Sequence, residues 1–348
     1  MLAFGGYPDL PLAKARKERE LAREMIAEGK DPGAEKQADR ERRLKERDQT
    51  FARLTDDYLA KQARNGRATS TLKKNRWVLD MACAEFGDVP VAELKAAQIL
   101  KALKKVEARG TFETARRLKT VIGSVIRYGI SCGWLDADPT PALRGALTRP
   151  VRKSHAAITD PKTLGGLLRA IDDFQGQTTT KLGLQLLALL YPRPGELRLA
   201  RWQEFDFKKA VWTIPAERTK MRRPHRVPLP HAALEILKEL KALTGHGELV
   251  LPSIRSSKAP MSDATFTAAL RRMGYDGDEM TAYGFRATFS TLANESGLWN
   301  PDAIERALAH VEGNAVRAAY ARSEFWDERV RMAGWWAEFL DDLKNARN

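Results

Sequence analysis

Apolar residues recur at helical spacing through most of the first half of the chain. Between residues 50 and 150, four segments each carry an apolar stripe, and their final glycines are Gly66, Gly87, Gly110 and Gly133. Because glycine readily adopts the left-handed conformation that ends a helix, we expect such a cap at each of them. Four helices of this length predict a compact helical bundle over residues 50–150.

The segment before this bundle is charged. "PLAKARKERELAREMIAEGKDPG" has apolar residues at helical spacing and stops at Gly29, and the dense mixed charge of "EKQADRERRLKERDQ" indicates a solvated helix or a linker. Periodicity then disappears after the bundle, at residues 136–161, where the chain has four prolines. We therefore predict an interdomain linker over residues 136–161.

The second half mixes helical and strand patterns. "KTLGGLLRAIDDF" and "TKLGLQLLALLY" predict helices, and the second is apolar nearly all round, which indicates burial. Runs of β-prone residues predict an antiparallel meander of three strands at Glu204–Phe207, Val211–Ile214 and Arg226–Leu229. Further helices are expected at 231–243, 263–273, 281–295, from Pro301 (capped by Asn300) towards Leu308, at 314–322 and at 325–345. The predicted fold class is mainly α with a small antiparallel sheet, in which a helical bundle precedes an α+β domain over residues 155–348.

The balance of basic and acidic residues indicates which kind of partner the protein binds. The chain has 59 Lys and Arg against 45 Asp and Glu, a formal net charge of +14, which points first to a nucleic acid partner. Ribosome-associated and membrane-surface proteins share such a balance. Lys73 and Lys74, and likewise Arg116 and Arg117, cluster near two helix starts; each alone fits a solvated face, while the set fits a DNA-facing surface.

Other classes of function find no support in the sequence. There is no phosphate-binding glycine loop, no H-E-x-x-H motif and no Cys/His cluster, so we expect neither a nucleotide cofactor nor a protein-held metal. Two distant cysteines, no secretory signal and no apolar run of membrane-spanning length favour a cytoplasmic protein, associated with the nucleoid when bound to DNA.

Cationic and phenolic residues in the second half could carry chemistry. In "YPRPGELRLARW", Arg193 ends an apolar helix three residues before Glu196. At a strand turn, "ERTKMRRPHRVPLP" gathers four cations that suit a phosphate backbone: Lys220, Arg222, Arg223 and Arg226. Arg286 lies among apolar neighbours, and a buried arginine requires an anion. His310 follows, with Tyr320 ten residues later. None of these residues, taken alone, is strong evidence of a function.

Their order is more specific: R-x-x-E, a lysine on a turn, G-F-R-A-T-F, L-A-H and A-Y. It resembles the tyrosine recombinase (phage integrase) family, and "RPGELRLARW", "WTIPAERTKMRRPHRVPL" and "GFRATFSTLA" are similar to prophage integrases of the satellite-phage type. Residues 50–150 resemble the family's core-binding domain, and residues 155–348 its catalytic domain. "FGGYPDLPLAKAR" resembles the closing segment of the arm-binding domain, so residues 1–49 are expected to be its remnant and a charged linker. The rest of that domain would be truncated or degenerate, which puts arm-site DNA binding in question.

The resemblance implies a role for each residue. Tyr320 would attack a scissile phosphodiester and form a 3′-phosphotyrosyl link, while Arg193 and Arg286 clamp the non-bridging oxygens. Lys220 would be the general acid for the departing 5′-oxygen, and His310 would hydrogen-bond the phosphate or assist proton transfer. Glu196 would orient these groups. The family chemistry needs neither ATP nor a metal.

One position departs from the family pattern. The family usually has histidine three residues before the second arginine, and here that position is Tyr283. Tyr283 is also a second candidate nucleophile, but its motif position is that of a base, and Tyr320 has the expected context.

The resemblance therefore implies a recombinase that integrates or excises a mobile element at double-stranded DNA attachment sites. It implies that the protein is a monomer when free in solution and assembles into a homotetramer on DNA. Accessory DNA-bending or excision factors would take part. Two alternatives stay open: supercoil relaxation by a lone subunit, and a catalytically impaired integrase remnant that only binds DNA. The Trp-rich C-terminal helix would either pack on its own domain or exchange with a neighbouring subunit.

Overall fold

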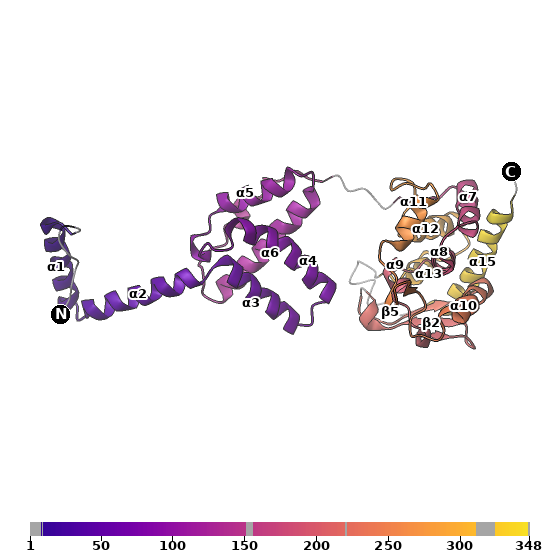
Figure 1. The fold of residues 1–348 in the computed structure, drawn as a ribbon, viewed down its shortest axis with the longest axis horizontal. Coiled ribbons are helices and arrows are strands. Elements are labelled where there is room, and N and C mark those ends of the chain that lie inside the picture. The colour runs from indigo at the N-terminus through magenta and orange to yellow at the C-terminus, as the bar shows by residue number, and fades with distance from the viewer. Residues whose placement is uncertain (1–7, 9, 151–155, 220, 311–323, 347–348) are drawn as a thin grey trace. The chain divides into compact units, whose positions relative to one another are not determined.

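The protein divides into two compact units, Met1–Arg152 and Lys153–Asn348, each with a hydrophobic core of its own. The structure is a computed structural model that describes residue 8 and residues 10–150, 156–219, 221–310 and 324–346, without the side chains of residues 39 and 41–46. Figure 1 shows the course of the chain through both units.

The first unit is entirely helical in its described part. Its elements are α1 (Leu12–Ala27), α2 (Pro32–Asp48), α3 (Phe51–Arg64), α4 (Thr69–Phe86), the short 3-10 helix η1 (Val91–Glu93), α5 (Ala96–Glu107), α6 (Phe112–Ser131) and the 3-10 helix η2 (Thr140–Leu143). Helices α3 to α6 pack against one another around fully buried Phe51, Leu79 and Ile122, which is the predicted bundle.

The glycine caps are as predicted at three of four helix ends. Gly66, Gly110 and Gly133 have φ of 70°, 75° and 70°. The prediction is wrong for Gly87, whose φ is −58°. There the chain is held by backbone bonds to the start of α3, because the Ala52 N–H donates to the Gly87 carbonyl at 2.9 Å. A left-handed residue is therefore not required.

The predicted linker over residues 136–161 is too long. Leu143 in η2 is buried in the core of the first unit, and Ala146 and Leu147 pack against it. Ile158 is already buried in the core of the second unit. The sequence signal failed because prolines interrupt helical periodicity without preventing apolar side chains from packing.

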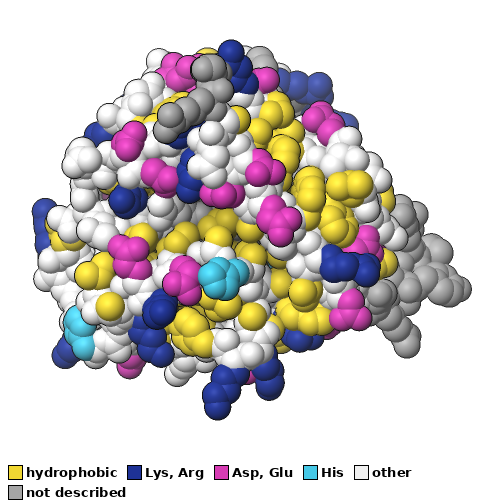
Figure 2. All heavy atoms as spheres, turned by 90° about the vertical axis from the view of Figure 1, so that its right-hand side faces the viewer, with side chains coloured by type: hydrophobic (Ala, Val, Ile, Leu, Met, Phe, Trp, Pro, Cys, Tyr) yellow, Lys and Arg dark blue, Asp and Glu magenta, His cyan; other side chains and the backbone are white. Residues whose placement is uncertain are grey.

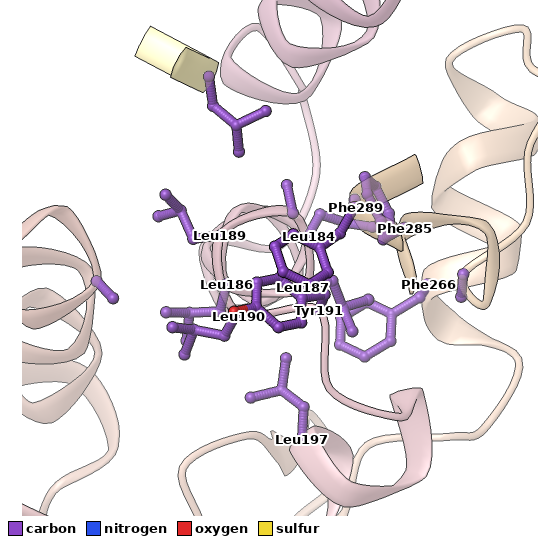
Figure 3. Packing of buried hydrophobic residues seen from close by; sticks show 14 of the residues in the cluster. Leu184, Leu186, Leu187, Leu189, Leu190, Tyr191, Leu197, Phe266, Phe285 and Phe289 are labelled. Carbon is purple, nitrogen blue, oxygen red and sulfur yellow. The ribbon is translucent and has the colours of Figure 1, made fainter. Parts of the chain in front are cut away.

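The second unit is built around one buried helix, α8 (Thr178–Leu190). Its helical elements are α7 (Pro161–Asp172), α8, α9 (Pro194–Arg198), the 3-10 helices η3 (Trp202–Glu204) and η4 (Ala216–Arg218), α10 (His231–Thr244), α11 (Thr265–Arg272), α12 (Gly284–Glu295), α13 (Pro301–Ala307) and α15 (Trp326–Asn345). Helices α7, α10, α11 and α15 pack against α8, whose leucines fill the core together with Phe285 and Phe289 (Figure 3). The predicted burial of α8 is confirmed.

A small antiparallel sheet in the order β1-β2-β3 lies in this unit: β1 (Phe205–Asp206), β2 (Val211–Ile214) and β3 (His225–Pro228). Trp212 pairs with Phe205 on one side and with Val227 on the other. The meander is as predicted, with β1 shorter and β3 one residue earlier. The hairpin of β4 (Pro252–Ser253) and β5 (Ser256–Pro260) was not predicted, because "SSKAP" lacks an alternating apolar pattern.

Helix α15 packs on its own unit, against α7 and α8. Trp336 is fully buried, and its indole N–H donates to the Ala188 carbonyl at 2.9 Å. None of the helices in the described ranges is both long and apolar enough to cross a membrane.

Candidate active site

Arg193 lies at the start of a short helix rather than at the end of the apolar one, which corrects the sequence-based placement. Helix α8 ends at Leu190, and Tyr191 follows with φ 42° and ψ 35°. The ring of Tyr191 stacks on Phe289 with 3.5 Å between centroids. Pro192 and Pro194 flank Arg193, so the chain restarts as α9 with Arg193 at its N-cap.

Glu196 orients Arg193. The carboxylate is buried, with 5% of the residue exposed. Its Oε2 accepts from the Arg193 backbone N–H at 3.0 Å, and its Oε1 accepts from Arg193 Nη1 at 2.8 Å. Both the backbone and the guanidinium of Arg193 are therefore fixed by one carboxylate.

Arg286 lies in the first turn of α12, and its guanidinium is close enough to Arg193 and Glu196 to interact with them electrostatically. Its Nη1 donates to the Tyr191 carbonyl at 2.9 Å, and its Nη2 donates to the Leu308 carbonyl at 2.6 Å. Burial, and then the charge of Arg193, lower the pKa of Arg286 to about 10, while Glu196 opposes this shift. Two guanidiniums thus face one buried carboxylate. A phosphate would supply the further negative charge that this arrangement favours.

His310 follows α13 and meets Arg286, with 3.1 Å between its Nε2 and Arg286 Nη2. Its Nδ1 lies 2.7 Å from Glu305 Oε2, and its backbone N–H donates to the Glu305 carbonyl at 3.0 Å. Asn300 caps α13 as predicted, since its side chain accepts from the Asp302 N–H. The structure thus brings Arg193, Arg286 and His310 together from three separate elements.

Tyr283 is the N-cap of α12, one turn before Arg286, and 45% of the residue is exposed. Its carbonyl accepts from the Arg286 N–H at 3.2 Å. Tyr283 is therefore at the surface beside the arginines.

Lys220 and Tyr320 lie outside the described residues. Around Lys220, Arg222 and Arg223 are exposed in the connection from β2 to β3. The Arg223 N–H donates to Thr219 Oγ1 at 3.1 Å. This connection therefore presents two cations to solvent.

Three polar residues of this region were not singled out from the sequence: Arg218, His225 and Arg329. Arg218 pairs with the buried carboxylate of Glu204 and donates to the carbonyl of Glu196. Arg329 is buried in α15 and donates to the Arg226 carbonyl. The Nε2 of His225 lies 3.1 Å from the Ala307 carbonyl oxygen. Only "RPHRVPLP" offered a signal, because it places a histidine at the start of a strand after a basic turn.

In the first unit, the two predicted basic sets lie on neighbouring helices. Lys73, Lys74 and Arg116 are exposed, whereas Arg117 is half-buried and donates to Asn75 Oδ1 at 3.1 Å. This bond joins α6 to α4, so Arg117 lies beside the helix that carries Lys73 and Lys74.

The second unit also has a groove of about 880 Å³ between α15 and the end of β3. Val330, Ala337 and Leu229 contribute apolar side chains, and Glu338 and Asp341 add acidic ones. Figure 2 shows hydrophobic side chains interspersed with both signs of charge on the face of the unit that it views. Because acidic groups repel phosphates, the groove does not have the charge of a DNA-binding surface. In the described parts of both units, no group of three or more His, Cys, Asp or Glu could hold a metal ion.

Three family models match the chain. The phage integrase central domain matches residues 51–146, and the phage integrase family model matches residues 158–326. An Arm DNA-binding domain model matches residues 1–39, in agreement with the resemblance of "FGGYPDLPLAKAR".

Similar proteins agree with these matches. The chain is 38% identical to the putative protein IntB of Escherichia coli (strain K12), over 98% of this chain and 89% of that protein. It is 34% identical to the integrase of Enterobacteria phage P4, over 99% of this chain and 81% of that protein.

The fold is that of solved integrases. A lambda integrase tetramer bound to a Holliday junction matches with a TM-score of 0.61 at 20% identity, over 76% of this chain and 79% of that chain. A lambda integrase dimer bound to a COC' core site matches with a TM-score of 0.59 at 20% identity, over 79% and 77%. The present chain belongs to the phage integrase family and is a tyrosine site-specific recombinase.

Proposed function

We propose that this recombinase cleaves and rejoins DNA through Tyr320, with Arg193, Arg286, His310 and Lys220 at the scissile phosphate. The Tyr320 hydroxyl gives its proton to water and its oxygen bonds to phosphorus, while the bond from phosphorus to the 5′-oxygen breaks. Lys220 donates a proton to that departing 5′-oxygen. A 5′-hydroxyl then attacks the 3′-phosphotyrosyl link and releases Tyr320. One ester replaces another, so no external energy source is required.

The convergence of Arg193, Arg286 and His310 carries this proposal. Both guanidiniums are held before DNA arrives, Arg193 by Glu196 and Arg286 by the Tyr191 and Leu308 carbonyls. Donors fixed in advance stabilise the charge that develops on phosphate oxygens without the cost of reorganisation. An unperturbed tyrosine is only about one part in a thousand ionised near neutrality, so the same cations favour formation of the nucleophile.

The partner is double-stranded DNA at attachment sites. The related lambda integrase is bound to a core site as a dimer and to a Holliday junction as a tetramer. We extend both features to this chain, which would act as a homotetramer with accessory DNA-bending or excision factors. The phosphate backbone would be contacted by basic residues of both units: Lys73, Lys74, Arg116 and Arg117 in the first, and Arg222 and Arg223 in the second.

A nicked suicide substrate tests the proposal. The duplex spans the direct repeat that flanks the gene in its genome, and a nick next to the cleavage point lets the 5′-hydroxyl fragment diffuse away. We expect the wild type to become covalently attached to the DNA, and Tyr320→Phe to leave it free. Tyr283→Phe is the matched control and should retain the covalent product. A covalent product in Tyr320→Phe, or none with the wild type, would overturn the proposal.

A further inference from the structure

The C-terminal end of α13 has three consecutive carbonyls that each accept a hydrogen bond from a different element. Ala307 accepts from His225 Nε2 at 3.1 Å, and Leu308 accepts from Arg286 at 2.6 Å. Ala309 accepts from Arg193 Nη2 at 3.2 Å. The last carbonyls of a helix have no intrahelical partner, and side-chain donors satisfy them here. This carbonyl triplet, residues 307–309, directly precedes His310.

His225 differs from the other two donors, because it has no assigned role at the phosphate. It is the first residue of β3, the strand that follows the turn with Lys220. A carbonyl oxygen can only accept, so Nε2 carries the hydrogen and donates. This bond links β3 to the end of α13, which are 82 residues apart in sequence.

The surroundings of His225 favour the neutral ring. The charged groups that face it are Arg329 from α15, Arg286 from α12 and Arg193 before α9. Burial, and then these positive charges, lower the pKa of His225 to about 3, although its bond to Ala307 acts in the opposite direction. A neutral imidazole with its hydrogen on Nε2 donates to the carbonyl without adding a fourth positive charge to the cluster.

We propose that His225 is a positioning residue for strand transfer. By donating to the Ala307 carbonyl, it fixes the last turn of α13, and with it His310, relative to the strand that follows Lys220. Arg193 and Arg286 bind the next two carbonyls but also serve the phosphate, so His225 is the member of the set dedicated to position. The inference rests on the proposed function of His310 at the phosphate.

A purely structural role would have a different signature. If His225 only joined β3 to α13 for stability, its loss would slow cleavage independently of His310. If it acts through His310, its loss has little further effect once the His310 imidazole is gone.

The experiment measures single-turnover cleavage of the nicked suicide substrate by the full chain. His225→Phe fills the space without a donor, and His225→Gln places an amide N–H near the position of Nε2. We expect His225→Phe to cleave about 10- to 100-fold more slowly, the scale expected for a small displacement of a catalytic group. His225→Gln should stay within a few-fold of the wild type, and DNA binding by both should be unchanged. His246→Phe, at an exposed histidine after α10, is the matched control.

A double variant decides between the two roles. His225→Phe combined with His310→Ala should be no slower than His310→Ala alone. The inference would be overturned if the two substitutions slowed cleavage by factors that multiply in the double variant. It would also be overturned if His225→Phe cleaved DNA at the rate of the wild type. If His225→Phe does not fold, His225→Asn replaces it, because the shorter amide cannot reach Ala307. Asn as fast as Gln would then contradict the inference. Absence of cleavage by the wild type would instead remove the proposed function itself.

Discussion

Glu196 binds Arg193 twice, through the backbone N–H at 3.0 Å and through the guanidinium at 2.8 Å. The side chain of Arg193 therefore cannot turn away from the site without breaking a bond to the residue that also caps its helix. Because Glu196 is buried beside the half-buried Arg193, it also neutralises part of the charge that Arg193 and Arg286 share.

Glu196→Gln tests this arrangement. The amide has one acceptor oxygen in place of two and no charge, so we expect the free energy of unfolding to fall by about 1–3 kcal/mol. We also expect single-turnover cleavage to slow by at least tenfold while DNA binding is retained. Urea titration and the suicide substrate measure the two effects. Glu248→Gln removes an exposed carboxylate that pairs with Arg201, and should change stability by less than about 0.5 kcal/mol. Equal behaviour of the two variants would contradict the role of Glu196.

Tyr283→His restores the residue that the family usually has three positions before the second arginine. Tyr283 is at the surface beside Arg286, so the smaller imidazole fits without repacking a core. An imidazole exchanges protons near neutrality more readily than a phenol, and a positioned acid or base contributes about 100-fold or more to rate. We therefore expect Tyr283→His to cleave DNA faster than the wild type at neutral pH, by up to about 100-fold. A rate equal to or below that of the wild type would show that Tyr283 already meets the chemical requirement.

The lowered pKa of His225 predicts that the free energy of unfolding depends on pH. Its pKa is about 3 in the folded protein and 6.5 as the ordinary value, so the unfolded chain binds the extra proton between these limits. Above pH 6.5 the neutral ring makes its full contribution to the free energy of unfolding. This contribution is lost as the pH falls towards 3, and the free energy of unfolding then decreases by up to about 1.4 kcal/mol per pH unit. His225→Gln should remove this contribution, and His246→Gln should not. Parallel stability curves for the wild type and His225→Gln between pH 6.5 and 4.5 would refute the assignment.

Ala309 has φ of 51°, a left-handed conformation that an L-residue adopts at a cost. Ala309→Gly removes this cost of about 1–2 kcal/mol but adds freedom to the unfolded chain, so we expect a net gain of up to about 1 kcal/mol. Ala303→Gly, inside α13, should instead destabilise by about 1 kcal/mol or more. Thermal unfolding of both variants provides the comparison, and loss of stability in Ala309→Gly would contradict it.

The sequence predicted the fold class and much of the site. Apolar periodicity located the long helices, since each buries one face, and the buried α8 was recognisable because apolar residues surround it. The order of motifs predicted that Arg193, Arg286 and His310 serve one site, and the structure brings these three together.

Other features leave no local pattern in a sequence. The carbonyl triplet is a backbone feature, so no residue type reports that His225, Arg193 and Arg286 converge on it. Tyr191 in a left-handed conformation is equally unmarked, because its stacking on Phe289 depends on tertiary packing. Strand β4 has only two residues, too few for alternation to be informative, and β5 lacks an alternating apolar pattern.

The central claim is that Tyr320 forms the covalent bond to DNA, and peptide mapping of the trapped complex tests it most directly. After nuclease trimming and trypsin digestion, Tyr320 lies in the peptide of residues 318–322, AAYAR, and Tyr283 lies in the peptide of residues 273–286. We predict that mass spectrometry finds the nucleotide adduct on residues 318–322 alone. An adduct on residues 273–286, or an unmodified 318–322 peptide from the purified covalent complex, would contradict the account.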